Sequence, residues 1–314
     1  MAMITAPSQR VVRRHHRREP HRAPGSTRAL LIALLIALAA LACRAPAAPQ
    51  AQTSARIASQ TVLADELLWQ LGPAVRARVV AVSPLADDPR YSTVVDQWPA
   101  DRPRIAGASE ALLARSPDLV VLASFNAPET RAFIEAHGVR TLTFDRFASF
   151  DDLRGNLRAL ARAADADAEA GVLLQQWDAR LASLAADHSR GRPMLAISWG
   201  DGLVAGADTS FDAIARQAGL RNLAAERGLV GHVPLGLEQL VAWDPEVIVL
   251  TCEPLPCPEA EREFAQRSGI RATQAARRAG IFAIPAPELS SIGAGMISAA
   301  ERLQARRIAL TEPP

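Results

Sequence analysis

Aromatic, acidic and basic side chains follow short apolar segments along this sequence. The segments are rich in Val, Ile and Leu, which is typical of buried strands, and they are Arg78–Ser83, Asp118–Ser124, Val139–Phe144, Pro193–Ser198, Glu246–Cys252 and Ile281–Ile284. Ligands of open α/β proteins contact the loops beyond the carboxyl ends of strands. The residues that this rule predicts to bind a ligand are Tyr91, Phe125, Arg146, Trp199, His232 and Glu253.

These side chains suit a large ligand with aromatic or charged parts. Arg146, like Arg90, could pair with an anionic chelate, and His232 could coordinate an iron centre. Each residue has a structural alternative. Tyr91 and Trp199 could pack within a domain, whereas the arginines and His232 could be ordinary surface residues.

The spacing of the remaining reactive residues disfavours catalysis and metal binding. After the N-terminal region, His137, His188 and His232 lie far apart and no carboxylate–histidine cluster accompanies them. Asp87 and Asp88 could form a catalytic pair, but the sequence has no Gly-x-Ser-x-Gly, Walker or His-Glu-x-x-His motif. We therefore expect no catalytic residue, no resident metal ion and no cofactor, and an exported hydrolase is the less favoured alternative.

Two cysteines, Cys252 and Cys257, are separated by four residues. In an oxidising compartment this spacing predicts a local disulfide. Two free thiols are the alternative, and a metal site is disfavoured because no further soft ligand lies nearby.

The first 42 residues have the pattern of an export signal. Residues 1–28 contain seven arginines and one acid, and an apolar run follows from Ala29 to Ala42. This run is shorter than the ~20 residues of a membrane-spanning helix. Cys43 ends the run as a candidate lipidation site, and ordinary cleavage near residues 45–47 is the alternative. Residues 43–55, rich in Pro, Ala, Gln and Thr, predict a flexible tether.

The charge of the chain changes once this leader is set aside. The full chain carries +2, and all 35 basic residues are arginines. From Cys43 onward, 28 arginines are set against 32 acidic residues, a net charge of −4. The sequence therefore gives no reason to expect nucleic-acid binding.

Helical patterns separate the strand segments, which predicts an α/β fold with parallel sheets. Examples are Ala64–Leu71, Ala127–His137 and Phe211–Ala218. Residues 150–188 lack any strand signal and predict one helix of about 55 Å, which Gly155 and Gly171 could interrupt. The expected organisation is a signal peptide at 1–42, a tether at 43–55, an N-terminal lobe at 56–149, an interlobe backbone helix at 150–190 and a C-terminal lobe at 191–314.

An internal repeat is the strongest signal in the sequence. Residues Glu110–Leu122 match Glu238–Leu250 at a constant offset of 128, with Glu, Leu, Ala, Pro, an acid and an apolar strand in register. Each copy predicts a helix, a proline stop and a buried parallel strand. Good helix-to-strand chemistry explains the proline and the strand, and dipole complementarity also favours an acid at the start of a helix. The recurrence of Glu at one position nevertheless favours a functional role.

Residues 56–310 resemble the helical-backbone (class III) substrate-binding proteins of ABC importers, the group that carries vitamin B12, ferric siderophores and haem. The resemblance rests on both copies of the repeat and on the segments Arg56–Ser59, Glu66–Leu68, Val80–Ser83 and Phe211–Asn222. It implies two Rossmann-like lobes joined by a single long helix, with the ligand between them. A Trp of the vitamin B12 relative stands where this chain has His232, and no Trp precedes Glu110 here, which departs from that relative.

The resemblance also implies partners and a location. Glu110 and Glu238 would pair with arginines of the two permease subunits of a permease and ATPase complex, and Arg–carboxylate pairing is directional. The cargo would be a siderophore, haem or cobalamin, and the protein would work in the periplasm, held to the membrane through a lipid on Cys43 or free. A two-lobed lipoprotein with a sensing or docking role is the alternative.

Overall fold

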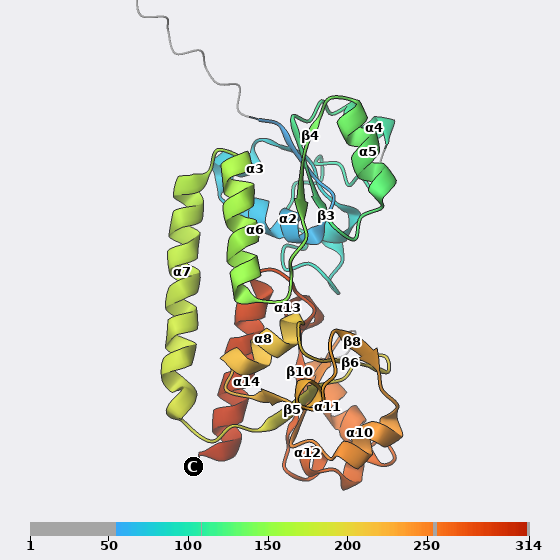
Figure 1. Cartoon of the computed structure of the whole chain (residues 1–314), viewed down its shortest axis with the longest axis vertical. Helices are drawn as coiled ribbons and strands as arrows, with labels where there is room; N and C mark the ends of the chain where they lie inside the picture. Colours follow the sequence, from blue (N-terminus) through green and yellow to red (C-terminus); the bar gives the residue numbers. More distant parts are fainter. Residues whose placement is uncertain (1–54, 108, 254–255, 313–314) are drawn as a thin grey trace, which may run out of the picture. The chain divides into compact units, whose positions relative to one another are not determined.

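The computed structural model describes residues 55–107, 109–253 and 256–312 (Figure 1). The architecture below belongs to residues 54–314, which form one compact unit. The predicted export signal, Cys43 and nearly all of the tether lie outside the described residues and stay predictions.

The first lobe is built on a four-stranded parallel sheet of order β2-β1-β3-β4. Its strands are β1 (Ile57–Ser59), β2 (Val79–Ala81), β3 (Leu119–Ala123) and β4 (Arg140–Phe144). Every residue of β3 is buried, as expected for a strand covered on both faces. Sequence reasoning found three of these strands and missed β1, which is only three residues long.

The second lobe repeats this arrangement with a parallel sheet of order β10-β9-β5-β7. Its strands are β5 (Leu195–Ser198), β7 (Arg221–Asn222), β9 (Val247–Thr251) and β10 (Ile281–Ile284). A small antiparallel ribbon joins β6 (Leu203–Ala205) to β8 (His232–Pro234). Two α/β lobes with parallel sheets confirm the predicted fold class, although the ribbon and β7 were not foreseen.

Helices connect and cover the strands. Those of the first lobe are α2 (Val62–Gln70), α3 (Pro73–Arg76), η1 (Pro84–Asp87), α4 (Glu110–Leu113) and α5 (Pro128–Ala136). Then come α6 (Phe150–Ala163), α7 (Asp167–Ala186) and η2 (Asp187–Ser189). The second lobe contributes α8 (Ser210–Gln217), α9 (Leu223–Glu226), α10 (Leu237–Trp243), α11 (Cys257–Ala265), η3 (Ile270–Ala272), α12 (Gln274–Arg277), α13 (Ala286–Leu289) and α14 (Gly295–Thr311).

The connection between the lobes differs in extent from the prediction. Instead of one helix over residues 150–188, the structure has a hairpin of α6 and α7, and the 20-residue α7 is the long helix. Asp165 adopts a left-handed conformation (φ 49°), and the Ala166 N–H bonds to the Ala161 carbonyl 2.9 Å away. This is the Schellman pattern that ends a helix, which glycine usually marks and an aspartate conceals here. Gly155 and Gly171, the predicted interruptions, lie inside the helices.

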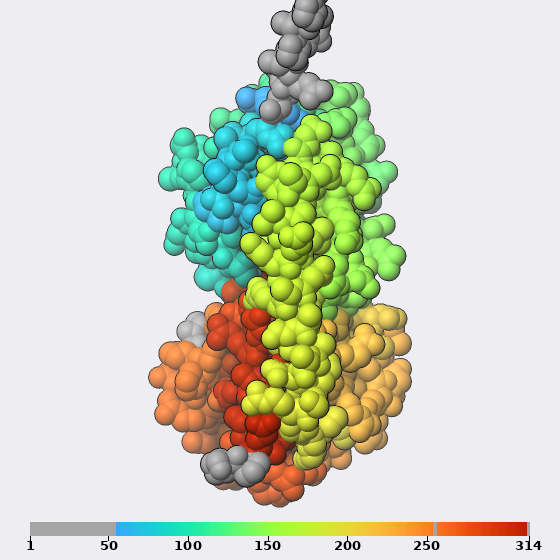
Figure 2. All heavy atoms as spheres, turned by 90° about the vertical axis from the view of Figure 1, so that its left-hand side faces the viewer, coloured from blue at the N-terminus to red at the C-terminus, as the bar shows by residue number. Residues whose placement is uncertain are grey.

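One apolar cluster runs through both lobes. It contains Ile57 and Val121 of the first sheet, Trp177 of α7, and Val249 and Phe282 of the second sheet, all buried. Figure 2 shows α7 lying over both lobes, with α14 beside the half nearer its C-terminus. We call this cluster the shared core, because it packs on one face of each sheet.

Each sheet packs its other face on a cluster of its own, and the two repeat segments lie there. Helices α4 and α10 insert Leu112 and Leu240, both fully buried, into these outer clusters. The acid that follows the proline also has a structural task in each copy. Asp118 accepts a bond from the Arg56 N–H (2.7 Å), and Glu246 accepts one from the Leu195 N–H (2.9 Å). Both acids thereby fix the start of the neighbouring strand.

Candidate functional site

A hollow of about 820 Å³ lies where loops of the two lobes meet. Its lining comes from Pro84 and the run 87–90, which follow β2 in the first lobe, and from Glu253, which follows β9 in the second. We call it the central hollow. All of its lining residues lie beyond the carboxyl ends of parallel strands, where α/β proteins place their ligands.

Three smaller hollows lie at the carboxyl ends of strands in one lobe or the other. A first-lobe hollow of about 660 Å³ follows β3 and β4 and is lined by residues including Asn126, Arg131, Glu135 and Asp145. A second-lobe hollow of about 350 Å³ contains Trp199, Asp201, Phe211 and His232, among others. An inner hollow of about 230 Å³ is lined by residues including Trp199, Asp201, Glu253 and Arg267.

Three of the six predicted ligand-binding residues line these hollows. Half-buried Trp199 lies between the inner and second-lobe hollows, and Glu253 lies between the inner and central hollows. His232 lines the second-lobe hollow from β8, where it pairs with Ala205. A direct role of these residues in binding stays a prediction.

The other three predicted residues lie outside the linings. Tyr91 is 44% exposed with the Arg90 guanidinium 5.3 Å from its ring centre. Phe125, 64% exposed, packs against Phe147 with ring centres 5.6 Å apart. Arg146 forms an ion pair with Asp152 at 2.8 Å. Their binding roles also stay predictions, since each lies on a carboxyl-end loop without lining a hollow.

Two buried acids that sequence reasoning did not assign to the site hold the loop of the central hollow. Asp65 of α2 accepts bonds from the Ser83 hydroxyl (2.5 Å) and N–H (3.2 Å). Its neighbour Glu66 accepts bonds from the hydroxyl (2.7 Å) and N–H (2.8 Å) of Thr93. The two carboxyls thus fasten both ends of residues 83–93. The signal available in the sequence was a pair of adjacent acids inside an apolar helical segment. The structure shows that residues 63–68 of this helix are all buried.

Burial dominates the electrostatics of this acid pair. It raises the pKa of Asp65 to about 7, against the opposing effect of its hydrogen bonds to Ser83 and Ser59. Burial likewise raises the pKa of Glu66 to about 7, against its bonds to Thr93. Glu66 also approaches the second lobe, because a Cβ built on Gly293 would collide with its carboxylate. Glycine at 293 therefore permits a close contact between the lobes.

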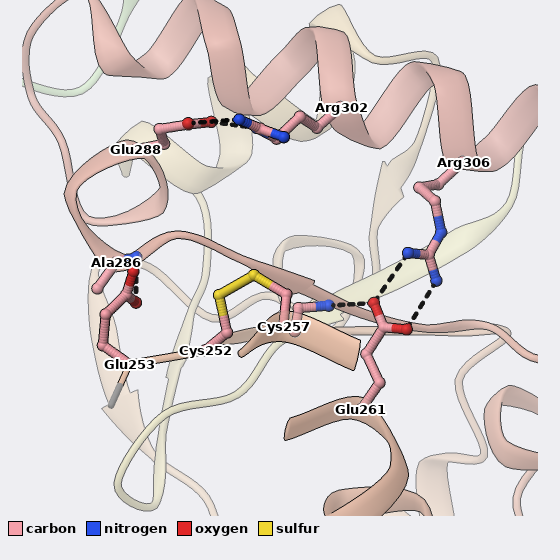
Figure 3. The surroundings of a disulfide bond; sticks show 9 residues. Cys252, Glu253, Cys257, Glu261, Ala286, Glu288, Arg302 and Arg306 are labelled. Atoms are coloured by element: carbon pink, nitrogen blue, oxygen red, sulfur yellow. Dashed lines mark hydrogen bonds and ion pairs between the residues drawn. A yellow bond between two sulfur atoms is a disulfide. The ribbon is translucent and has the colours of Figure 1, made fainter. Parts of the chain in front are cut away.

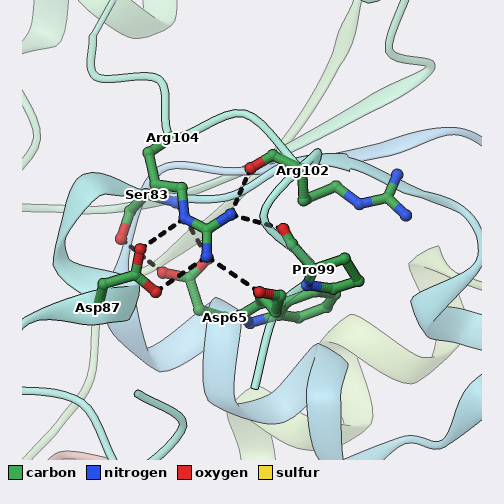
Figure 4. Close-up of polar contacts among 7 residues, drawn as sticks. Asp65, Ser83, Asp87, Pro99, Arg102 and Arg104 are labelled. Carbon is green, nitrogen blue, oxygen red and sulfur yellow. Dashed lines mark hydrogen bonds and ion pairs between the residues drawn. The ribbon is translucent and has the colours of Figure 1, made fainter. Parts of the chain in front are cut away.

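A second set of contacts, made by Arg104, holds the same loop (Figure 4). Arg104 contacts both carboxylate oxygens of Asp87, at 2.7 and 2.9 Å. It also donates to the carbonyls of Trp98, Pro99 and Arg102. A bidentate pair with further acceptors holds Asp87 in one orientation at the wall of the central hollow.

The opposite wall is shaped by the segment that contains the two cysteines (Figure 3). Cys252 and Cys257 are within bonding distance, with their Cα atoms 4.6 Å apart. Glu253 follows directly, and its carboxylate accepts the N–H of Ala286 at 2.5 Å. This bond fixes Glu253 to the start of α13. The Glu253 side chain therefore faces the first lobe but is held in place by the second lobe.

The repeated glutamates lie apart from the hollows. Glu110 and Glu238 are exposed in the first turns of α4 and α10. Within the described parts of the chain, neither carboxylate has an ion-pair or hydrogen-bond partner. The second acids of the repeat, Asp118 and Glu246, differ in this respect because they form hydrogen bonds within the fold.

Residues 55–107, 109–253 and 256–312 contain no group of three or more His, Cys, Asp or Glu arranged to hold a metal ion. Within these residues, no helix has the length and hydrophobicity of a membrane span.

Comparison with known proteins assigns the family. A model of the periplasmic binding protein family matches residues 57–288, more than half of the chain. The chain therefore belongs to the periplasmic binding protein family, whose members are extracytoplasmic.

Individual relatives differ in what they bind. A cobalamin-binding protein of Halobacterium salinarum is 26% identical over 201 residues, which make up 62% of this chain and 53% of that protein. The chain thus spans about half the length of the curated relatives that it matches. The structure of the periplasmic heme-binding protein RhuT from Roseiflexus sp. RS-1 is 25% identical, with a TM-score of 0.66 over 82% of this chain and 98% of that one. The vitamin B12 binding protein BtuF of Vibrio cholerae shares the fold, with a TM-score of 0.67 at 18% identity over 82% of this chain and 98% of that one.

The acid pair makes stability depend on pH. Each folded pKa, about 7, lies above the ordinary value, 3.8 for Asp65 and 4.5 for Glu66. The stability that these carboxyls contribute is therefore complete below about pH 4 and is lost as the pH rises towards 7. As the pH rises from 5 to 7, we expect the free energy of unfolding of the wild type to fall. In the double variant Asp65→Asn with Glu66→Gln it should fall less steeply, by up to about 1.4 kcal/mol per pH unit for each carboxyl group that is replaced.

Urea unfolding at several pH values measures this difference. Asp167→Asn, at an exposed position on α7, is the matched control and should follow the wild-type curve. Parallel curves for the wild type and the double variant would show that the buried carboxyls do not titrate in this range.

Proposed function

We propose that this protein is the extracytoplasmic solute-binding component of an ABC importer. It holds an iron chelate (a siderophore or haem) or cobalamin between its lobes and delivers it to the permease. The observation that carries the proposal is the central hollow, which takes its lining from the carboxyl-end loops of both lobes. A ligand in this position contacts both lobes, so its binding favours one relative arrangement of them.

The relatives support a chelate as the cargo. A cobalamin-binding protein matches in sequence, and a heme-binding protein matches at 25% identity over nearly its whole length. The four hollows along the carboxyl-end loops also suit a bulky cargo, since the largest alone is about 820 Å³. Relatives that are named as binding proteins support binding and delivery as the proposed function.

The repeated glutamates support the importer as the partner. Each is exposed, lies in the first turn of a short helix on the outer layer of its lobe, and is followed by the same arrangement of helix and buried parallel strand. A permease built from two similar subunits offers two similar sites, which a pair of equivalent carboxylates can fill. Charges at such exposed positions affect docking more than folding.

Export of the chain would allow two covalent changes, lipidation of Cys43 and a disulfide between Cys252 and Cys257. We include in the proposal that residues 1–42 direct export, that Cys43 is lipidated in a membrane-anchored form, and that Cys252 and Cys257 form a disulfide in the oxidising compartment. A bond between these cysteines would hold Glu253 between β9 and α11.

Tryptophan fluorescence reports on cargo binding, because Trp199 lines two hollows. We expect cyanocobalamin, haemin or a ferric siderophore to quench the emission with a saturable dependence on concentration. Trp199→Phe should lose most of the quenching, whereas Trp243→Phe, on α10 in the outer layer, should retain it. The absence of saturable quenching with every chelate would contradict the proposed function.

Uptake by cells tests the docking role. Glu110→Ala with Glu238→Ala should abolish uptake of the cargo while leaving its affinity for the purified protein within about twofold, since neither residue lines a hollow. Glu129→Ala with Glu259→Ala removes two exposed acids from the first turns of α5 and α11 and should leave uptake intact. Normal transport by the first pair would rule out these glutamates as anchors.

Mass spectrometry tests the cysteine pair. The exported protein, denatured without reductant, should gain the mass of two hydrogen atoms on reduction and only then accept two alkyl groups, at Cys252 and Cys257. Cys252→Ser with Cys257→Ser provides the matched control and should show neither change. Immediate alkylation of the wild type at both cysteines would show that they are free thiols.

A further inference from the structure

We propose that the carboxyl-end hollows select a cargo without net negative charge, a neutral or cationic chelate whose periphery offers hydrogen-bond donors, and that Glu253 and Asp201 are residues that set this preference. The inference rests on the proposed function, because it assumes that a chelate occupies these hollows. It goes further by distinguishing among the chelates that relatives of this protein bind.

The central hollow presents more carboxylates than free cations. Its charged lining consists of Asp87, Asp88, Arg90 and Glu253. Arg90 is occupied by Asp88, which it contacts through Nε at 3.0 Å and through Nη2 at 2.6 Å. This pairing lowers the pKa of Asp88 to about 2 and keeps the carboxylate ionised. Arg90 is thus paired with a carboxylate of its own loop.

The arginine nearest to Asp87 is also unavailable to a cargo. Arg104 is 21% exposed and uses its donors on Asp87 and on three backbone carbonyls (Figure 4). The positive charge of Arg104 holds the loop and balances the negative charge of Asp87. The wall of the central hollow therefore offers no uncommitted guanidinium among the described residues.

Glu253 faces the hollow without a cationic partner. One carboxylate oxygen accepts the Ala286 N–H, and no arginine or histidine nitrogen of the described residues lies within 4.0 Å of it. Figure 3 shows where the nearby arginines are directed: Arg302 pairs with Glu288 and Arg306 pairs with Glu261. The carboxylate of Glu253 is therefore free to interact with the cargo.

The flanking hollows show the same imbalance. Arg131 of the first-lobe hollow pairs with Glu135 at 3.2 Å, and Arg267 of the inner hollow lies 3.7 Å from Glu263. Asp145 and Asp201, both exposed, have no ion pair within the described parts of the chain. Arg146, which sequence reasoning offered to an anionic chelate, is paired with Asp152.

This charge distribution discriminates among cargoes. Ionised carboxylates are acceptors only, so amide or ammonium groups of a cargo form charge-assisted bonds with them. The propionates of haem or the phenolates of a catecholate siderophore would face like charge and lose their hydration without gaining a donor. A neutral corrinoid or a cationic hydroxamate chelate meets no such penalty.

A panel of four chelates tests the inference in the full exported protein at pH 8, where imidazole groups are ordinarily neutral. The probes are cationic ferrioxamine B, neutral cyanocobalamin, haemin with two propionates and trianionic ferric enterobactin. Calorimetry should give at least tenfold tighter binding to one of the first two than to either anionic chelate. High salt should reduce this difference in affinity, because it screens the charges of the exposed carboxylates.

Two substitutions link the preference to the named residues. Glu253→Gln keeps an acceptor for Ala286, and Asp201→Asn suits the left-handed backbone of that position (φ 49°). The double variant should narrow the ratio of affinities at least threefold, whereas Glu129→Gln with Glu259→Gln, outside the hollows, should leave it unchanged.

The outcomes separate this inference from the proposed function. Tightest binding of haemin or ferric enterobactin, or an unchanged ratio in the double variant, overturns the charge preference and leaves chelate binding standing. Failure of all four chelates to bind overturns the proposed function and, with it, the inference.

Discussion

The shared core is the interaction on which the rest of the structure depends. Parallel strands need crossover helices, and these helices must bury an apolar face on the sheet. Here α6, α7 and α14 cover one face of each sheet with a single cluster that includes Leu157, Trp177 and Met296. Both sheets pack on this cluster, and loops beyond the carboxyl ends of strands in both sheets line the central hollow. The outer faces are left to separate clusters, where the repeated helices α4 and α10 lie.

The site is assembled from loops that are held from within their own lobes. Asp65, Glu66 and Arg104 hold residues 83–93 in the first lobe, and the Ala286 N–H holds Glu253 in the second. Of these anchors, Arg104 carries positive charge, and it is withdrawn from the cargo because its donors are used on Asp87 and on backbone carbonyls. Arg90, Arg131 and Arg267 also lie beside carboxylates of their own lobes, which leaves Glu253 and Asp201 at the hollows without an ion pair among the described residues.

The sequence predicted what local chemistry determines and missed what tertiary contacts determine. The apolar segments before Ser124 and Cys252 gave strands in the expected places because buried parallel strands need continuous apolar runs. The helix break at Asp165 escaped because a left-handed aspartate replaced the usual glycine. Loop membership could likewise be predicted for Tyr91 and Trp199, but only Trp199 lines a hollow. The direction of a loop side chain depends on anchors such as Asp65, which lie far away in sequence.

A crystal structure with the tightest-binding chelate would locate the cargo. We expect one chelate to lie in the central hollow and to contact residues 84–90 of the first lobe together with Glu253 of the second. A chelate bound to one lobe alone, or on the outer layer beside Glu110 or Glu238, would contradict this expectation.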